Sequence, residues 1–197
     1  FALESYQDQL AAFPQTVWVS EEILRDLADT QTPQGIVAVL QKEEVGLPDF
    51  SQGKFLFLED VQDPGNVGTM IRTADAAGFT GVIVSDKSAD LYSLKTLRSM
   101  QGSHFHLPIY RMTPADFVEE AKKSNLPILA TTLSKESKDY RELSPLENFA
   151  LVMGNEGQGI SSIMAESADQ LVHIGMKGRA ESLNVAVAAG VLMFFFS

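Results

Sequence analysis

The sequence contains no cysteine and only three histidines, which narrows the chemistry available to it. Without cysteine there is no disulfide framework, no thiolate metal site and no cysteine nucleophile, and a reducing cytoplasm suits such a chain. His104 and His106 stand two apart in a strand-like run, which predicts that they share one face of a strand. Packed or surface histidines, His173 included, are commoner than metal ligands, so we expect no metal site.

A long apolar run and a targeting segment are also absent. The longest uncharged apolar stretch, 183–196, is too short to span a bilayer and contains Asn184, so it predicts a buried core helix. The first residues, FALESYQDQL, lack the basic and apolar regions of a signal peptide. Because the first residue is Phe1, we expect the natural N-terminus to lie upstream. These features predict a protein that does not enter a membrane.

Basic residues are few: 15 Lys and Arg stand against 26 Asp and Glu, a net charge of −11 over 197 residues. This balance argues against a surface coated with cations for nucleic acid. The cations are unevenly placed, however, and several lie close in sequence to the motifs described below. These are Lys87, Lys95, Arg98, Arg111, Lys177 and Arg179. Any binding of RNA must therefore rely on a local basic surface.

The chain is expected to contain a small N-terminal segment and one larger domain. Residues 1–46 are typical of the end of a small domain, with a helix capped by Ser20 and, after the turn QTPQG, a strand at Ile36–Leu40. Residues 47–53, rich in turn formers, are expected to be a linker. The larger domain should cover residues 54–197.

Strands and helices alternate through the larger domain. The expected strands are Phe55–Leu58, Gly81–Val84, Leu107–Arg111, Pro127–Thr131, Phe149–Met153 and Leu171–Ile174. The expected helices are Val67–Ala77, Leu94–Met100, Pro114–Lys123, Ile160–Ser167 and Asn184–Phe196. This order predicts an α/β fold, a mostly parallel sheet with helices on both faces. Ligands bind such sheets at the carboxyl ends of the strands, so the loops after Leu58, Thr131, Met153 and Ile174 should carry the chemistry.

The first of these loops, EDVQDPGN, leads into a helix. Pro64 and Gly65 form a tight turn, and Asn66 stands where a cap would open the helix. Arg72 lies at the edge of the inward stripe of that helix, where a solvated arginine is the commoner outcome. The inward stripe consists of Val67, Ile71 and Ala74, and Gly78 is the expected C-cap.

The other loops also carry unusual residues. Gly154, Gly157 and Gly159 surround Glu156 straight after an apolar strand, which indicates backbone brought close to a partner, although a plain strand-to-helix turn is an alternative. Polar pairs mark two further loops, each of which also has a structural explanation as a strand end or a helix cap. These pairs are Thr131 with Thr132, and Ser182 with Asn184.

Glycine spacing excludes two nucleotide-binding patterns. A dinucleotide site would suit Asp86, an acid at the end of the second expected strand, but Gly65 and Gly68 do not give the G-x-G-x-x-G spacing. A phosphate-binding P-loop needs lysine followed by serine or threonine, and neither follows Gly159 in register.

Taken in order, three segments resemble the motifs of the SpoU (TrmH-like) family of RNA ribose 2′-O-methyltransferases, in the SPOUT superfamily. They are N-x-G-x-x-x-R-T-A at Asn66–Ala74, G-N-E-G-x-G at Gly154–Gly159 and E-S-L-N-V at Glu181–Val185. The resemblance covers residues 54–196. Residues 17–41 also resemble the end of the family's N-terminal RNA substrate-binding domain. One position departs from the family pattern: Gly175 stands where proline is usual, and we expect a more flexible loop there.

The resemblance implies a C-terminal trefoil knot, a homodimer, and S-adenosylmethionine (SAM) as the cofactor. The substrate it implies is structured RNA, with ribosomal RNA slightly favoured over transfer RNA. The implied catalytic residues are Arg72, Asn66, Glu156, Ser182 and Asn184. The implied cofactor-binding residues are Thr131, Thr132, Leu133, Gly154, Asn155, Gly157, Ile174, Met176, Ser182, Leu183 and Asn184. The alternative is a non-catalytic RNA-binding protein that retains the fold.

Overall fold

The computed structural model describes residues 1–28, 30, 32–42 and 45–197. The chain divides into two compact units, residues 1–44 and 45–197. The first unit contains the short 3-10 helix η1 (Glu4–Tyr6) and the helix α1 (Glu21–Ala28). Ser20 accepts a hydrogen bond from the backbone N–H of Ile23 at 3.4 Å, which confirms the expected cap. Among the described residues, no helix has the length and apolar character needed to cross a membrane.

The expectation of a strand at Ile36–Leu40 is wrong. Ile36 makes a single antiparallel bridge with Ala2, and residues 37–40 belong to no strand. Val39 and Leu40 are 80% and 64% exposed. Val37 exchanges two backbone hydrogen bonds with Phe1, at 2.8 and 2.9 Å, but among the described residues the pairing goes no further. An apolar run needs a neighbouring strand along its length and a core to form a strand.

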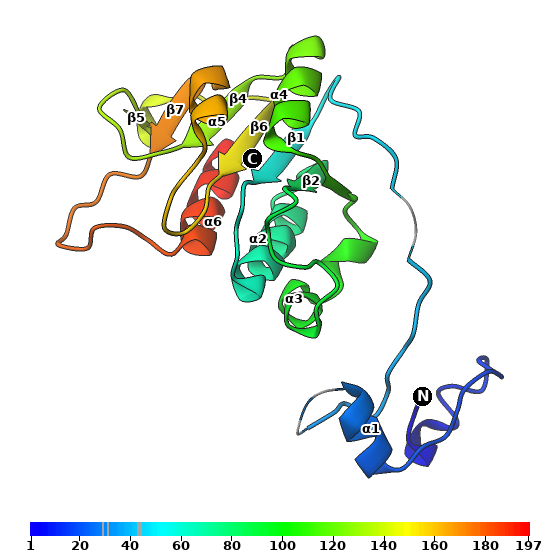
Figure 1. Cartoon of the computed structure of the whole chain (residues 1–197). Helices are drawn as coiled ribbons and strands as arrows, with labels where there is room; N and C mark the ends of the chain where they lie inside the picture. Colours follow the sequence, from blue (N-terminus) through cyan, green and yellow to red (C-terminus); the bar gives the residue numbers. More distant parts are fainter. Residues whose placement is uncertain (29, 31, 43–44) are drawn as a thin grey trace. The chain divides into compact units, whose positions relative to one another are not determined.

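The second unit is built on a seven-stranded sheet, in the order β3-β2-β1-β6-β4-β7-β5 (Figure 1). Every paired neighbour runs parallel, which confirms the predicted fold class. The strands are β1 (Lys54–Leu58), β2 (Gly81–Val84), β3 (Ile109–Arg111), β4 (Ile128–Thr131), β5 (Lys138–Asp139), β6 (Phe149–Met153) and β7 (Gln170–His173). The two-residue strand β5 was not expected from the sequence.

Helices pack on both faces of this sheet. They are α2 (Pro64–Ala76), α3 (Leu94–Met100), α4 (Pro114–Lys123), α5 (Ser162–Ser167) and α6 (Val185–Phe196), with short 3-10 turns η2 (Ser103–Phe105) and η3 (Tyr140–Glu142). Alternate residues of β1 point to opposite faces. Leu56 and Leu58 join a core with residues of α2 and α6, whereas Phe55 and Phe57 join a second core with residues of α4 and α5. Figure 1 shows α2 between α3 and α6.

Two local expectations are corrected by the structure. Asn66 does not cap α2: the helix begins at Pro64, and the side chain of Asp63 is the cap, accepting the backbone N–H of Asn66 at 2.9 Å. Proline suits the first helical position, because its φ is preset and its missing N–H would have no partner there. His104 and His106 do not share a strand: His104 lies in η2, and His106 follows it with Nδ1 3.1 Å from an oxygen of Asp75.

Helices α2 and α3 approach closely at Gly68, the glycine of the first motif. A Cβ on Gly68 would lie 2.6 Å from Ser99 Cβ and 2.6 Å from the carbonyl oxygen of Thr96. Gly68 is therefore needed for helix packing, whatever its neighbours in the motif do.

We expect Gly68→Ala to destabilise the protein by about 1–3 kcal/mol, because α3 has to move to admit the methyl group. Thermal unfolding measures the change. Gly178→Ala is the matched control: a Cβ there meets nothing within 4 Å, so its melting temperature should stay near that of the wild type. Equal melting temperatures for the two variants would contradict the close approach of α2 and α3.

Candidate active site

A cleft of about 680 Å³ opens at the carboxyl ends of β4, β6 and β7. Three of the four loops expected to carry chemistry line it: those after Thr131, Met153 and Ile174. All the expected cofactor-binding residues line this cleft: Thr131, Thr132, Leu133, Gly154, Asn155, Gly157, Ile174, Met176, Ser182, Leu183 and Asn184. Sequence reasoning missed further lining residues: Met153, Gln158, Gly159, Val172, His173, Glu181, Val185, Ala188 and Leu192. Most of these are strand ends or the first turns of α6, next in sequence to residues that were found.

The glycine-rich loop is folded on itself. Asn155 and Gly159 exchange two backbone hydrogen bonds of 2.9 Å. The Oδ1 atom of Asn155 accepts the N–H groups of Gly157 and Gln158, and its Nδ2 donates to the carbonyl of Asp60. A Cβ on Gly154 would lie 2.3 Å from the carbonyl carbon of Gly159. The close approach that Gly154 permits is thus one between two parts of the loop.

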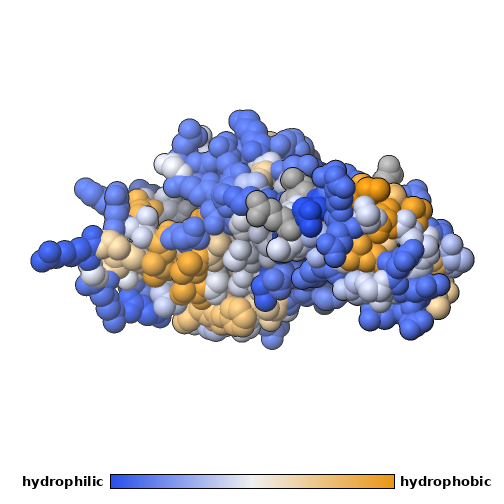
Figure 2. All heavy atoms as spheres, turned by 90° about the horizontal axis from the view of Figure 1, so that it is seen from below, coloured by the Kyte–Doolittle hydropathy of each residue, from blue (hydrophilic) through white to orange (hydrophobic). Residues whose placement is uncertain are grey.

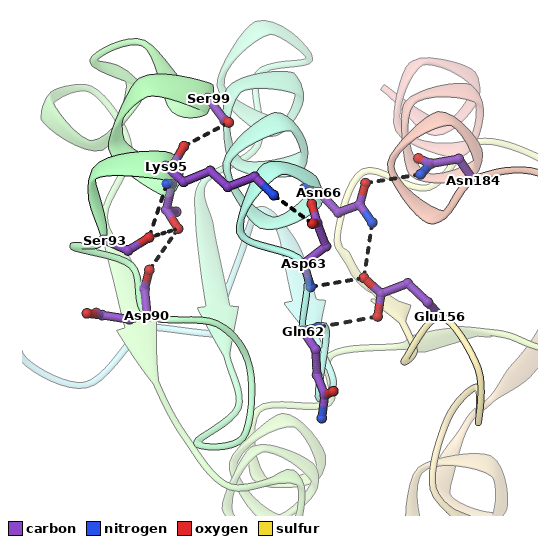
Figure 3. A network of polar contacts seen from close by, with 10 residues as sticks. Gln62, Asp63, Asn66, Asp90, Ser93, Lys95, Ser99, Glu156 and Asn184 are labelled. Atoms are coloured by element: carbon purple, nitrogen blue, oxygen red, sulfur yellow. Dashed lines mark hydrogen bonds and ion pairs between the residues drawn. The ribbon is translucent and has the colours of Figure 1, made fainter. Parts of the chain in front are cut away.

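Glu156 joins the glycine-rich loop to the start of α2 (Figure 3). Its Oε1 accepts the N–H of Asp63 at 3.3 Å and Nδ2 of Asn66 at 3.0 Å. Its Oε2 accepts the N–H of Gln62 at 3.3 Å. The carboxylate therefore has three donors, two from the loop that follows β1 and one from the first turn of α2.

Asn66 extends this network to α6. Its Oδ1 accepts Nδ2 of Asn184 at 3.1 Å. Asn184 is the N-cap of α6, as expected, and its Oδ1 accepts the N–H groups of Ala186 and Val187. One residue from each of the three motifs thus belongs to a single hydrogen-bonded chain: Asn66, Glu156 and Asn184.

The charges around this network favour ionised carboxylates. Burial opposes ionisation of Glu156, but the hydrogen bonds from Asn66 and from backbone N–H groups outweigh it and lower its pKa. The ammonium of Lys95, 2.9 Å from Asp63 Oδ2, and the N–H of Asn66 lower the pKa of Asp63. Lys95 thereby also ties α3 to the cap of α2 (Figure 3).

Arg72 and Ser182 stand apart from the network. Arg72 is exposed on α2, six residues or about 9 Å along the helix from Asn66. Its guanidinium makes no hydrogen bond or ion pair with any residue that the structure describes, so Asn66, Glu156 and Asn184 do not orient it here. Ser182 is exposed at the edge of the cleft. Within the described ranges, no group of three or more His, Asp or Glu side chains is arranged to hold a metal ion.

A sequence profile of the SpoU rRNA methylase family matches residues 53–194. The chain belongs to this family. The match begins one residue before β1 and ends within α6, so it takes in the whole sheet, the network and the cleft.

Individual proteins also resemble the chain over most of its length. The 23S rRNA (guanosine(2553)-2'-O)-methyltransferase RlmP of Bacillus subtilis is 43% identical over 180 residues, covering 91% of this chain and 71% of its own. The structure of an AdoMet-bound rRNA methyltransferase from Sinorhizobium meliloti has a TM-score of 0.87 at 34% identity, covering 96% of this chain and 76% of that one. The methyltransferase AviRb of Streptomyces viridochromogenes, in complex with AdoMet, has a TM-score of 0.81 at 31% identity, with coverages of 98% and 77%.

The lowered pKa of Glu156 predicts how this SpoU site responds to pH. Because the folded state binds the proton less tightly than the unfolded chain, ionised Glu156 stabilises the fold above its ordinary value of 4.5. This contribution is lost as the pH falls through the lowered pKa of the folded state. We expect Glu156→Gln to lower the melting temperature at neutral pH and to flatten its fall below about pH 4.5.

The measurement is thermal unfolding across this pH range. Glu166→Gln, which alters an exposed glutamate on α5, is the matched control and should follow the wild-type curve. A Glu156→Gln curve parallel to the wild type at every pH would show that the carboxylate contributes no charge-dependent stability.

Proposed function

We propose that this protein transfers the methyl group of SAM to a ribose 2′-hydroxyl of ribosomal RNA. The observation that carries the proposal is the cleft at the carboxyl ends of β4, β6 and β7, to which all three SpoU motifs are connected. The names of the relatives support it: RlmP is a 2′-O-methyltransferase of 23S rRNA, and two of the structural neighbours contain AdoMet.

The residues of the cleft fit SAM. The cleft volume of about 680 Å³ is typical of small-molecule sites. Apolar side chains suited to an adenine ring come from two loops, those after β4 and β7: Leu133, Ile174, Met176 and Leu183. Polar groups suited to the ribose and the amino-acid part come from Thr132 and Ser182, because the side chains of Thr131 and Asn155 already donate to backbone carbonyls. When bound, SAM supplies an electrophilic methyl group, so the protein has to provide orientation and electrostatic stabilisation.

We assign the electrostatic part to Arg72. A ribose hydroxyl is a weak nucleophile until its proton leaves or its developing negative charge is stabilised. The guanidinium of arginine stays protonated in proteins and cannot serve as a base. It can stabilise the developing alkoxide and hold a phosphate through paired N–H donors. Arg72 is exposed and has no partner among the described residues, so its donors are free to meet RNA.

Binding of RNA has to overcome the net charge of −11. Lys87 and Lys95 stand beside Asp60 and Asp63, at 3.9 and 2.9 Å, so acids already offset two of the expected cations. As the resemblance implies, we propose that residues 1–46 are the end of a domain that holds the substrate. They carry two Lys or Arg against eight Asp or Glu, so they do not themselves offset the negative charge. The trefoil knot and the cytoplasmic location stay predictions.

Arg72→Ala should lower the single-turnover rate of methyl transfer to ribosomal RNA by about 100–1000-fold, the usual effect of removing a donor to a developing oxyanion. SAM affinity and melting temperature should hardly change, because the side chain is exposed and does not line the cleft. Radiolabelled SAM at saturating RNA measures the rate, and calorimetry the affinity.

Lys123→Ala, which removes an exposed cation of α4, is the control and should keep the wild-type rate at saturating RNA. If Arg72→Ala kept most of its turnover, the mechanism would be wrong. SAM binding without methyl transfer by the wild type would favour the non-catalytic RNA-binding alternative.

We also propose a homodimer formed through α6. Val187, Val191 and Phe194 are 54%, 37% and 59% exposed and recur at helical spacing. Figure 2 shows apolar residues gathered in patches on the face seen from below, and such patches are typical of protein interfaces.

Light scattering at micromolar concentration should give twice the chain mass of 21.5 kDa for the wild type and the single mass for Phe194→Asp, because a buried charge opposes the interface. Ile163→Asp, at a residue 42% exposed on α5, should stay dimeric. A monomeric wild type would refute the dimer.

A further inference from the structure

The loop after β7, which forms one wall of the cleft, is held by the segment that contains β5. Asp139 of β5 pairs with His173 of β7 in the parallel register. Two side-chain contacts reinforce this pairing. The N–H of Gly175 donates to Asp139 Oδ2 at 3.2 Å, and Ser137 Oγ lies 2.9 Å from His173 Nδ1. Gly175 itself stands between two residues of the cleft wall.

Asp139 is in turn fixed by Arg141. Nε and Nη2 of Arg141 donate to its two oxygens at 2.7 Å each, a bidentate pair with defined geometry. This pair, with the further N–H donated by Gly175, holds the pKa of Asp139 far below its usual range, so it is a carboxylate at any pH of interest. The neighbouring Tyr140 packs edge-on against Phe195 of α6, with ring centroids 4.8 Å apart. The segment is therefore anchored to the body of the second unit.

This arrangement explains why glycine stands at position 175. A Cβ there would lie 2.5 Å from Asp139 Oδ2 and 3.4 Å from Arg141 Nη2, so the carboxylate occupies the space of a side chain. The proline that usually stands here in the SpoU motif has no N–H and could not make the bond to Asp139. The loop expected to be more flexible has a different restraint, a hydrogen bond to a fixed carboxylate.

We propose that Asp139, held by Arg141, is a positioning residue that fixes the Ile174–Met176 wall of the SAM cleft through the N–H of Gly175. Ile174 and Met176 flank the bonded residue and both line the cleft. Asp139 is not among the lining residues, so it acts through the loop. The identity of the ligand rests on the proposed function; the contact between Asp139 and Gly175 does not.

Asp139→Ala should free the loop. In the ligand-free protein, the amide of Gly175 should exchange its hydrogen faster, as NMR measures, because its acceptor is gone. SAM should bind about tenfold more weakly by calorimetry, the usual loss when a hydrogen bond to a charged group is removed. The single-turnover rate at saturating SAM should stay within about twofold, because the bond shapes the binding wall and not the reacting groups.

A double-mutant cycle tests whether the two residues act as one unit. Gly175→Ala keeps the N–H, but its methyl group collides with the carboxylate, so it should also weaken SAM binding. In the double variant the collision is removed, and the affinity should equal that of Asp139→Ala alone. Losses that simply multiply would show two independent roles and overturn the proposal.

Two further variants separate the loss of this hydrogen bond from a loss of folding or of any surface carboxylate. Asp139→Asn preserves the size of the side chain and keeps an acceptor while losing the charge, so it should fold and weaken SAM binding by less than Asp139→Ala. Glu120→Ala removes a half-buried carboxylate paired with Lys123 at 2.7 Å on α4, and it should leave both SAM affinity and Gly175 exchange unchanged.

The outcomes separate the two proposals. A wild-type protein that binds no SAM overturns the proposed function, whereas faster Gly175 exchange in Asp139→Ala would still support the tether. A wild type that binds SAM, with Asp139→Ala binding equally well and Gly175 exchanging at the wild-type rate, overturns the tether alone.

Discussion

The carboxylate of Glu156 is the interaction on which the arrangement of the site depends. It accepts two backbone N–H groups from the loop after β1 and one side-chain N–H from the first turn of α2, the helix that carries Arg72. Through Asn66 it is also connected to Asn184, at the start of α6. Asn66, Glu156 and Asn184 are far apart in the sequence, and they come from the start of α2, the loop after β6 and the N-cap of α6. A carboxylate can join them because it offers several acceptor positions, which backbone and amide N–H groups fill.

The order of the strands explains why these loops meet. β6 lies between β1 and β4, and β7 follows β4, so the carboxyl ends of β1, β6, β4 and β7 are consecutive along one edge of the sheet. The loops that leave β4, β6 and β7 line the cleft, and the loop that leaves β1 supplies the donors to Glu156. Parallel strands place all these loops at one edge. The edge strand β5 lies beside β7, and its Asp139 accepts the N–H of Gly175 in the loop after β7.

Much of this could be predicted from the sequence, because the apolar runs of the buried strands and the glycines and polar residues that follow them are local signals. Apolar strands such as Phe149–Met153 have no stable alternative to a central position in a covered sheet. The wrong predictions concern segments whose sequence is compatible with two local structures. Asp63 and Asn66 can both cap a helix, and Pro64 decides in favour of Asp63 because it fits the first helical position. The run around His104 has a strand-like composition but lies in a 3-10 turn, which no periodicity revealed.

Other features depend on contacts that no sequence window contains. The two residues of β5 form a strand only because β7 lies beside them, and the bond from Gly175 to Asp139 spans 36 positions. The absence of proline at Gly175 was visible in the sequence, but the carboxylate that replaces its restraint was not. In the same way Gly68 has the pattern of a functional motif, and only the position of α3 shows that it is a packing residue.

The central claim is that the site directs a methyl group to ribose and not to a base. The most direct test is to incubate ribosomal RNA that lacks the modification with the protein and isotopically labelled SAM, digest it to nucleosides, and analyse these by mass spectrometry. We expect the label in 2′-O-methylnucleosides, on the sugar fragment. Label in a base fragment, or no label in RNA under conditions where SAM is bound, would contradict the claim.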